Sequence, residues 1–192
     1  MNTQLLARLR ETGAVRVGGP FNLASGGVSD HYFDVKRLLL DPEGLSLTAG
    51  LVVDLLAKGY PDVTAIGGPE LGAVPLVGAA LARWHAAAPD ARAMTGFVVR
   101  KAPKAHGTGQ RIEGRLESGA LPQLTALVED VTTTARSVIE GMEQVEAAGA
   151  RVVVVFVVVN RGGNLARKAV EDRGAKFVPL LDSEAVLKFV RG

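Results

Sequence analysis

Residues 127–137 read Leu-Val-Glu-Asp-Val-Thr-Thr-Thr-Ala-Arg-Ser and give the clearest indication of how the chain folds. A short apolar run ends in two acids, Glu129 and Asp130, and small hydroxyl residues then lead into a helix-like segment. Carboxylates accept hydrogen bonds from vicinal sugar hydroxyls, and the backbone N–H groups at the start of a helix bind phosphate. The stretch therefore suits a ribose phosphate, although an ordinary strand–loop–helix connection with solvated acids would have the same pattern.

Strand-like and helix-like segments alternate on both sides of this stretch. The expected strands are short and apolar, at residues 28–35, 63–66, 94–99, 125–128, 152–159 and 176–181. The expected helices lie at residues 2–11, 42–58, 71–88, 134–148 and 164–173, with Asp41 as an N-cap. This alternation predicts an α/β fold with a mainly parallel central sheet flanked by helices. Ligands bind at the carboxyl ends of such strands, so the loops there should carry the chemistry.

Length and composition predict one domain spanning residues 1–192. The absence of cysteine excludes disulfides, thiolate zinc sites and cysteine nucleophiles. A formal net charge of +2 is too small to indicate nucleic acid as the main partner. The longest apolar run, residues 152–159, is too short to cross a membrane, and the N-terminus lacks the pattern of a signal peptide. We therefore expect a cytoplasmic protein without a membrane or nucleic-acid partner.

Residues 98–109 form a second motif, in which three cations and a histidine follow a predicted strand within a glycine-containing polar segment. These residues are Arg100, Lys101, Lys104 and His106. Such a loop can close over an anionic substrate and exclude water. A solvated basic loop is the alternative interpretation.

Two further motifs follow predicted strands. Arg161, after the strand at 152–159, suits a planar carboxylate because its guanidinium binds two oxygens at once, although it could instead pair with a surface acid. Residues 67–73, Gly-Gly-Pro-Glu-Leu-Gly-Ala, form a turn whose glycines let backbone amides approach an anion.

In this order, the motifs resemble those of the type I phosphoribosyltransferases, and residues 100–106 together with Arg161 resemble the orotate branch of that family. The resemblance covers essentially the whole chain and implies the type I phosphoribosyltransferase fold, with a helix and a small N-terminal hood in residues 1–40. It further implies that the protein transfers the 5-phosphoribosyl group of phosphoribosyl pyrophosphate to orotate. The products would be orotidine 5'-monophosphate and pyrophosphate, in de novo pyrimidine (UMP) biosynthesis.

The resemblance also implies a role for each site residue. The catalytic residues would be Lys101, Lys104, His106 and Asp130. The residues that bind phosphoribosyl pyrophosphate would be Arg100, Lys101, Lys104, His106, Glu129, Asp130, Val131, Thr132, Thr133, Thr134, Ala135, Arg136 and Ser137. The orotate-binding residues would be Thr133 and Arg161. The pyrophosphate loop would be Gly68, Pro69, Glu70, Leu71 and Gly72.

The chain departs from the family pattern at several positions. Ala24 replaces a hood lysine, whose charge Lys36 or Arg37 could supply, and the pyrophosphate loop has no lysine. Asn160 replaces the acid that usually precedes the orotate-binding arginine. Ala135 stands near the usual loop glycine, and if the backbone there needs a positive φ, alanine costs on the order of 1 kcal/mol.

The resemblance implies Mg²⁺ as cofactor, held chiefly by phosphate oxygens and water, so we expect no dedicated protein metal ligands. It also implies a homodimer with shared active sites. One alternative is a purine or uracil phosphoribosyltransferase on the same fold, which would gain little from Arg161. Another is a non-catalytic regulator that senses phosphoribosyl pyrophosphate.

Overall fold

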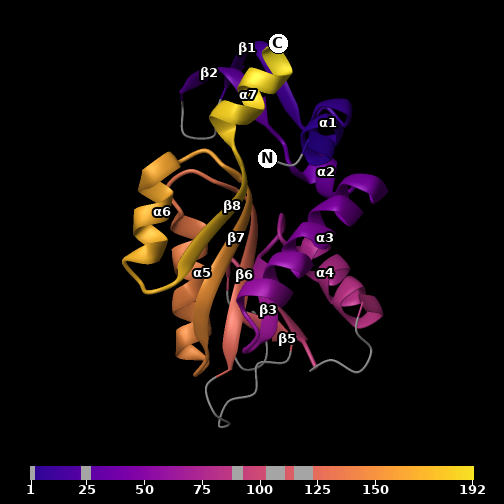
Figure 1. Ribbon diagram of the computed structural model, residues 1–192. Helices are drawn as coiled ribbons and strands as arrows, with labels where there is room; N and C mark the ends of the chain where they lie inside the picture. The colour runs from indigo at the N-terminus through magenta and orange to yellow at the C-terminus, as the bar shows by residue number, and fades with distance from the viewer. Residues whose placement is uncertain (1–2, 23–26, 88–92, 103–110, 115–122) are drawn as a thin grey trace.

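A six-stranded sheet forms the centre of the computed structural model, which describes residues 3–22, 27–87, 93–102, 111–114 and 123–192 (Figure 1). The strand order is β5-β4-β3-β6-β7-β8, and all neighbours are parallel except β4 and β5. The strands are β3 (Val63–Pro69), β4 (Thr95–Val99), β5 (Ile112–Gly114), β6 (Leu124–Thr132), β7 (Arg151–Asn160) and β8 (Lys176–Asp182). The expected α/β fold with a mainly parallel sheet is therefore confirmed.

Helices cover both faces of this sheet. Figure 1 shows α5 (Arg136–Ala147) and α6 (Gly163–Glu171) on one face, and α3 (Pro42–Gly59) and α4 (Val74–Ala87) on the other. Strand β7 is buried on both faces, because Val154, Phe156 and Val158 pack into one core and Val155 and Val157 into the other. A continuous apolar run is typical of a parallel strand covered on both sides.

A smaller unit lies at the carboxyl end of the sheet. It contains the antiparallel pair β1 (Val15–Asn22) and β2 (Val28–Phe33), together with α1 (Thr3–Glu11), α2 (Lys36–Leu39) and α7 (Ser183–Arg191). The Arg191 guanidinium pairs with Asp30 of β2 at 2.5 Å, and Arg10 lies over the Phe189 ring at 4.9 Å. This unit is the N-terminal hood that was expected within residues 1–40, completed by a C-terminal helix.

Several element boundaries differ from those expected. The strand expected at residues 125–128 continues to Thr132, so Glu129 and Asp130 belong to β6. Strands β1 and β5 and helices α2 and α7 were not expected. The N-cap at Asp41 is confirmed, since its carboxylate accepts a hydrogen bond from the Gly44 N–H at 2.8 Å.

Candidate active site

The turn from β6 to α5 is shaped as an anion cradle. Ala135 adopts a left-handed conformation, with φ 60° and ψ 15°, so the backbone does need a positive φ at this position. Its N–H donates to the Thr132 hydroxyl at 3.1 Å, which fixes the turn. Alanine has no polar side chain to cap the helix, and the first-turn N–H groups of α5 therefore remain available to an anion.

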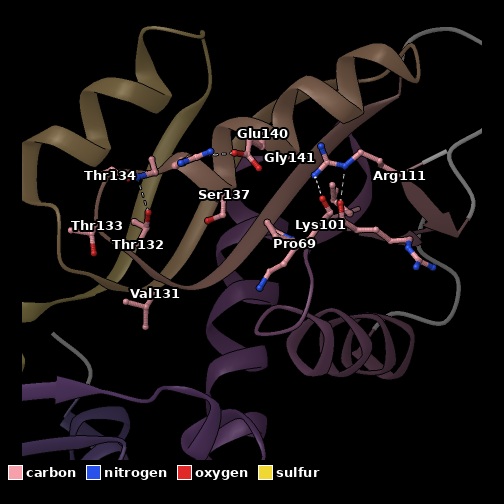
Figure 2. Close-up of a pocket in the computed structure, with 14 residues that line it drawn as sticks. Pro69, Lys101, Arg111, Val131, Thr132, Thr133, Thr134, Ser137, Glu140 and Gly141 are labelled. Atoms are coloured by element: carbon pink, nitrogen blue, oxygen red, sulfur yellow. Dashed lines mark hydrogen bonds and ion pairs between the residues drawn. The ribbon is translucent and has the colours of Figure 1, made fainter. Parts of the chain in front are cut away.

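A pocket of about 530 Å³ opens at this cradle. Figure 2 shows Thr132, Thr133 and Thr134 on one side, Lys101 and Arg111 on the other, and Ser137 between them. Its lining residues are Pro69, Val99, Arg100, Lys101, Arg111, Val131, Thr132, Thr133, Thr134, Ala135, Arg136, Ser137, Glu140 and Gly141. The structure thus brings the hydroxyl turn and the start of the basic loop to one cavity.

Two of these cradle residues have side chains engaged elsewhere. The Ser137 hydroxyl donates to the Glu129 carboxylate at 2.6 Å, so only its backbone N–H is free to meet an anion. The Arg136 side chain is 86% exposed and pairs with Glu140 at 2.9 Å. The Arg136 side chain is thus directed to solvent in this conformation.

The two adjacent acids have different surroundings. Glu129 is 5% exposed, and its burial, followed by the nearby charge of Asp130, raises the pKa of its carboxyl well above the ordinary value of 4.5. Asp130 is only partly buried, and its carboxylate accepts the Val131 N–H at 2.8 Å. A side chain at position 72 would collide with the Asp130 carboxylate, which explains the glycine there. Asp130 is therefore the acid better placed to meet a ligand.

The loop after β3 is joined to the start of the basic segment. The Glu70 N–H donates to the Val99 carbonyl at 2.9 Å, and the Glu70 carboxylate accepts the Lys101 N–H at 2.8 Å. The Glu70–Leu71 peptide bond is cis. Gly68 packs so closely on the Val128 carbonyl that no side chain would fit. These contacts hold the candidate pyrophosphate loop against β4 and β6.

The basic segment leaves the sheet through a β4–β5 hairpin. Its stem pairs Val99 with Ile112, and Arg100 forms an ion pair with Glu113 at 3.0 Å. Lys104 and His106 lie outside the described residues. Arg111 lines the pocket and was not singled out in the sequence, where its only signal is a cation that closes the glycine-containing segment.

Arg161 is tied to the phosphate cradle through the backbone. Its N–H donates to the Thr132 carbonyl at 2.8 Å, and a side chain at Gly162 would collide with the Thr133 carbonyl. The Arg161 guanidinium lies 5.3 Å from the ring centre of Phe33, which comes from the hood. The expected orotate residues, Thr133 and Arg161, therefore belong to adjoining loops, and Phe33 lies beside Arg161.

Asn160, the replacement for the usual acid, stabilises the Arg161 loop. Its side-chain oxygen accepts the Gly162 N–H at 3.0 Å, and its amide nitrogen donates to Asp182 at 3.2 Å. An aspartate here would face the Asp182 carboxylate, so asparagine is the residue that satisfies both partners.

Lys36 and Arg37 differ in where their charges lie. The Lys36 ammonium is 3.2 Å from the Asp34 carboxylate. Burial tends to lower the pKa of Lys36, but Asp34 and Asp130 outweigh it, and the pKa of Lys36 is raised. The Arg37 guanidinium instead lies beside Gly13, near the end of α1. Of the two cations, Lys36 is the one whose charge acts on the acid at the site.

The described residues contain no group of three or more His, Asp or Glu side chains placed to hold a metal. Within those same residues, no helix has the length and apolar character needed to span a bilayer. Carboxylate donors such as Asp130 beside an anion cradle fit a hard cation that a phosphorylated ligand and water would coordinate for the most part.

Solved structures of orotate phosphoribosyltransferases share this architecture. The Mycobacterium tuberculosis orotate phosphoribosyltransferase in complex with Fe(III) dicitrate superposes with a TM-score of 0.77 and 32% identity, covering 95% of this chain and 97% of that one. The same enzyme in complex with phosphoribosyl pyrophosphate superposes with a TM-score of 0.73 and 28% identity over 95% and 96% of the two chains. Strand order, hood and cradle together place the protein among the type I phosphoribosyltransferases.

Sequence comparison identifies the branch of the type I phosphoribosyltransferases to which the chain belongs. No protein-family model matches the chain. It is, however, 37% identical over 188 residues to the orotate phosphoribosyltransferase of Thermococcus gammatolerans, a match that covers 96% of this chain and 91% of the relative. The chain belongs to the orotate phosphoribosyltransferase family.

Proposed function

We propose that the protein transfers the 5-phosphoribosyl group of phosphoribosyl pyrophosphate to orotate, forming orotidine 5'-monophosphate and pyrophosphate in pyrimidine biosynthesis. The observation that carries this proposal is the pocket lined by both the turn after β6 and Lys101. The Arg161 N–H donates a hydrogen bond to the Thr132 carbonyl of the same turn. A sugar phosphate and a leaving diphosphate each have a complementary partner in this pocket, and a carboxylated base has one in Arg161 beside it.

The 5-phosphate would occupy the cradle formed by residues 131–137. Backbone N–H groups at the start of α5 and the hydroxyls of Thr133 and Thr134, both exposed at the pocket, would donate to it. Asp130 would accept hydrogen bonds from the ribose hydroxyls. Glu129, whose carboxylate accepts a hydrogen bond from the Ser137 hydroxyl, would hold the start of α5 in place.

Orotate would lie between the hood and the loop after β7. The Arg161 guanidinium would bind the orotate carboxylate through two parallel hydrogen bonds. Phe33 would pack beside the base, and Thr133 would form a hydrogen bond with it. A base without a carboxylate would leave the charge of Arg161 unpaired, and this favours orotate over uracil or the purines.

Bond cleavage at the anomeric carbon gives an oxocarbenium-like state and places negative charge on the departing pyrophosphate. Lys101 and Arg100, joined by Lys104 and His106, would stabilise that charge. When bound, Mg²⁺ would neutralise further charge on the phosphate oxygens. Orotate is already acidic at its ring nitrogen, so no strong protein base is required. Lys36, whose charge acts on Asp130, would add positive charge near that acid.

The family resemblance also supports a homodimer with shared active sites and a cytoplasmic location. Leu71, in the candidate pyrophosphate loop, is 70% exposed, and a second subunit covering this edge of the site would bury it. A sedimentation experiment that found only monomers at micromolar concentrations would contradict the dimer.

Acceptor specificity tests the proposed function directly. Loss of orotate absorbance in the presence of phosphoribosyl pyrophosphate and Mg²⁺ should be rapid, and hypoxanthine, guanine and uracil should give no comparable turnover. Omission of Mg²⁺ should abolish most of the activity. Faster turnover of a purine or of uracil would support the rival enzymes, whereas nucleic-acid binding in a gel-shift assay without any turnover would support a regulator.

Arg161→Ala should mainly raise the KM for orotate. Charge-assisted hydrogen bonds contribute about 1.5–3 kcal/mol, so we expect a roughly 10- to 100-fold increase. Arg161→Lys keeps the charge but loses the paired geometry, and it should fall between the parent and the alanine variant. An unchanged KM for orotate in Arg161→Ala would remove this residue from the base site.

A further inference from the structure

The backbone of Lys101 is held from two sides. Its N–H donates to the Glu70 carboxylate at 2.8 Å, and its carbonyl oxygen accepts the Arg111 guanidinium at 2.8 Å. Figure 2 shows Arg111 directed at Lys101, with both side chains beside the pocket. Both contacts are made by charged groups, and hydrogen bonds of this kind are about twice as strong as those between neutral groups.

The two contacts join parts of the site that are separate in sequence. Glu70 belongs to the candidate pyrophosphate loop, 31 residues before Lys101. Arg111 lies 10 residues after it, at the far end of the basic segment. Arg111 also donates to the Arg100 carbonyl at 2.9 Å, and its own carbonyl accepts the Arg100 N–H at 2.7 Å. The stem of the basic segment is thereby closed and fixed to the loop after β3.

We infer that Glu70 and Arg111 are positioning residues, which fix the backbone of Lys101 so that its ammonium reaches the pyrophosphate subsite. The inference rests on the proposed function, in which Lys101 stabilises the leaving group. It gives Glu70 a role different from that of a pyrophosphate ligand, and gives a role to Arg111, which no motif identified.

The physical reason lies in the length of the lysine side chain. Lysine carries about 2 kcal/mol of rotamer entropy, and a mobile backbone would add to the freedom lost when the ammonium meets its target. A charged donor contributes most to a transition state when it is already oriented before the reaction. Anchoring both the N–H and the carbonyl of Lys101 removes the backbone part of that cost.

Direct contact between Glu70 and pyrophosphate is the competing explanation, and the charges oppose it. A carboxylate beside the leaving group would repel the charge that develops there. The Glu70 oxygen that points toward the basic segment is already occupied by the Lys101 N–H. The loop itself has no lysine, and its Glu70 acts on a lysine elsewhere.

A double-mutant cycle between Glu70 and Lys101 tests the inference. Glu70→Ala should lower kcat roughly 10- to 100-fold, the range for a charge-assisted hydrogen bond, with a much smaller change in the KM for phosphoribosyl pyrophosphate. Glu70→Gln should recover most of this loss, because its amide oxygen can accept the same N–H. In a Lys101→Ala background, Glu70→Ala should have no further effect on kcat.

Arg111→Ala should behave in the same way, lowering kcat in the parent and having no effect in the Lys101→Ala background. A further loss in that background would mean that Arg111 acts on the substrate directly, and would remove it from the inference. Thermal unfolding of each variant identifies losses caused by misfolding, and any variant with a lowered midpoint is assayed well below it.

Additive losses for Glu70 and Lys101 would overturn the inference, as would a Glu70→Gln variant no more active than Glu70→Ala. Full activity of Lys101→Ala would also overturn it, while leaving orotate transfer by the parent intact. Failure of the proposed function would look different, because the parent itself would then consume no orotate.

Discussion

At the scale of single residues, Glu129 and Asp130 have different roles because successive side chains of β6 point to opposite faces of the sheet. Glu129 faces the buried side and receives the Ser137 hydroxyl, whereas Asp130 stays partly exposed beside Gly72. Burial disfavours the charged form of a carboxyl, and the nearby charge of Asp130 adds to this effect on Glu129. The pair is therefore expected to hold fewer than two negative charges near neutral pH.

The raised pKa of Glu129 should make the free energy of unfolding depend on pH. Because the pKa of Glu129 is higher in the folded protein than in the unfolded chain, its contribution is fully present below pH 4.5 and is lost as the pH rises towards the folded value. Relative to Glu129→Gln, which is neutral at every pH, the parent should lose at most about 1.4 kcal/mol of unfolding free energy per pH unit. Urea denaturation between about pH 5 and 8 measures the two slopes, and parallel slopes would contradict the assignment.

At the scale of elements, the site depends on how β6 passes into α5. The strand continues to Thr132, and Ala135 then reverses the backbone in a left-handed conformation before the helix begins at Arg136. Ala135 is also fully buried against the core beneath α5. The turn therefore combines backbone strain with a methyl group that packs well, and the two effects oppose each other in any substitution.

Substitutions at Ala135 should separate strain from packing. Ala135→Gly relieves about 1–2 kcal/mol of left-handed strain but loses a buried methyl group and gains freedom in the unfolded chain, so the unfolding free energy should change by less than about 1 kcal/mol. Ala135→Val should destabilise the protein by at least about 2 kcal/mol, since a β-branched residue tolerates neither the conformation nor the crowding. Denaturant unfolding compares the three proteins. A valine variant as stable as the parent would show that the turn is not strained.

The same elements show what could be predicted from the sequence. Residues 152–159 and 63–66 were identified as strands because β-branched and apolar runs bounded by glycine or polar residues are typical of a parallel sheet. Strand β1 was missed because Gly18, Gly19 and Pro20 look like a turn. Strand β5 was missed because its three residues follow a polar segment and gain order only by pairing with β4.

The site was predicted in part: the cradle, the loop at 68–72 and Arg161 were identified as motifs. The bond from Arg111 to Lys101 was not, because it depends on side-chain direction and not on residue type.

At the scale of the whole molecule, the hood and the sheet share one hydrophobic core, and charged contacts add to it. Arg8 of α1 donates to both carboxylate oxygens of Asp41, each at 2.7 Å, and Asp41 also caps α3. The Arg8 hydrogen bonds, followed by the Gly44 N–H, lower the pKa of Asp41 to about 2. One carboxylate thus links the first helix to the helix that covers the sheet.

Acid should weaken this link as the Asp41 carboxylate becomes protonated. Because the pKa of Asp41 is depressed in the folded protein, its contribution is present above pH 3.8 and is lost as the pH falls towards about 2. Asp41→Ala should lower the Tm by a few degrees at neutral pH, and its difference from the parent should shrink over that acid range. Asp54→Ala, at an exposed acid of the same helix, should have little effect at any pH. A difference that persisted at pH 2 would contradict the assignment.

The pairing of Asp30 with Arg191 joins residues that are 161 positions apart. It therefore bears on the order in which parts of the site form during translation. A nascent chain emerging from the ribosome carries the β1–β2 hairpin long before α7 exists, and an isolated two-stranded hairpin is only marginally stable in water. Phe33 should therefore settle beside Arg161 only after α7 has been made. During synthesis, the phosphate-binding turn between β6 and α5 should therefore form before the orotate site between Phe33 and Arg161 is complete.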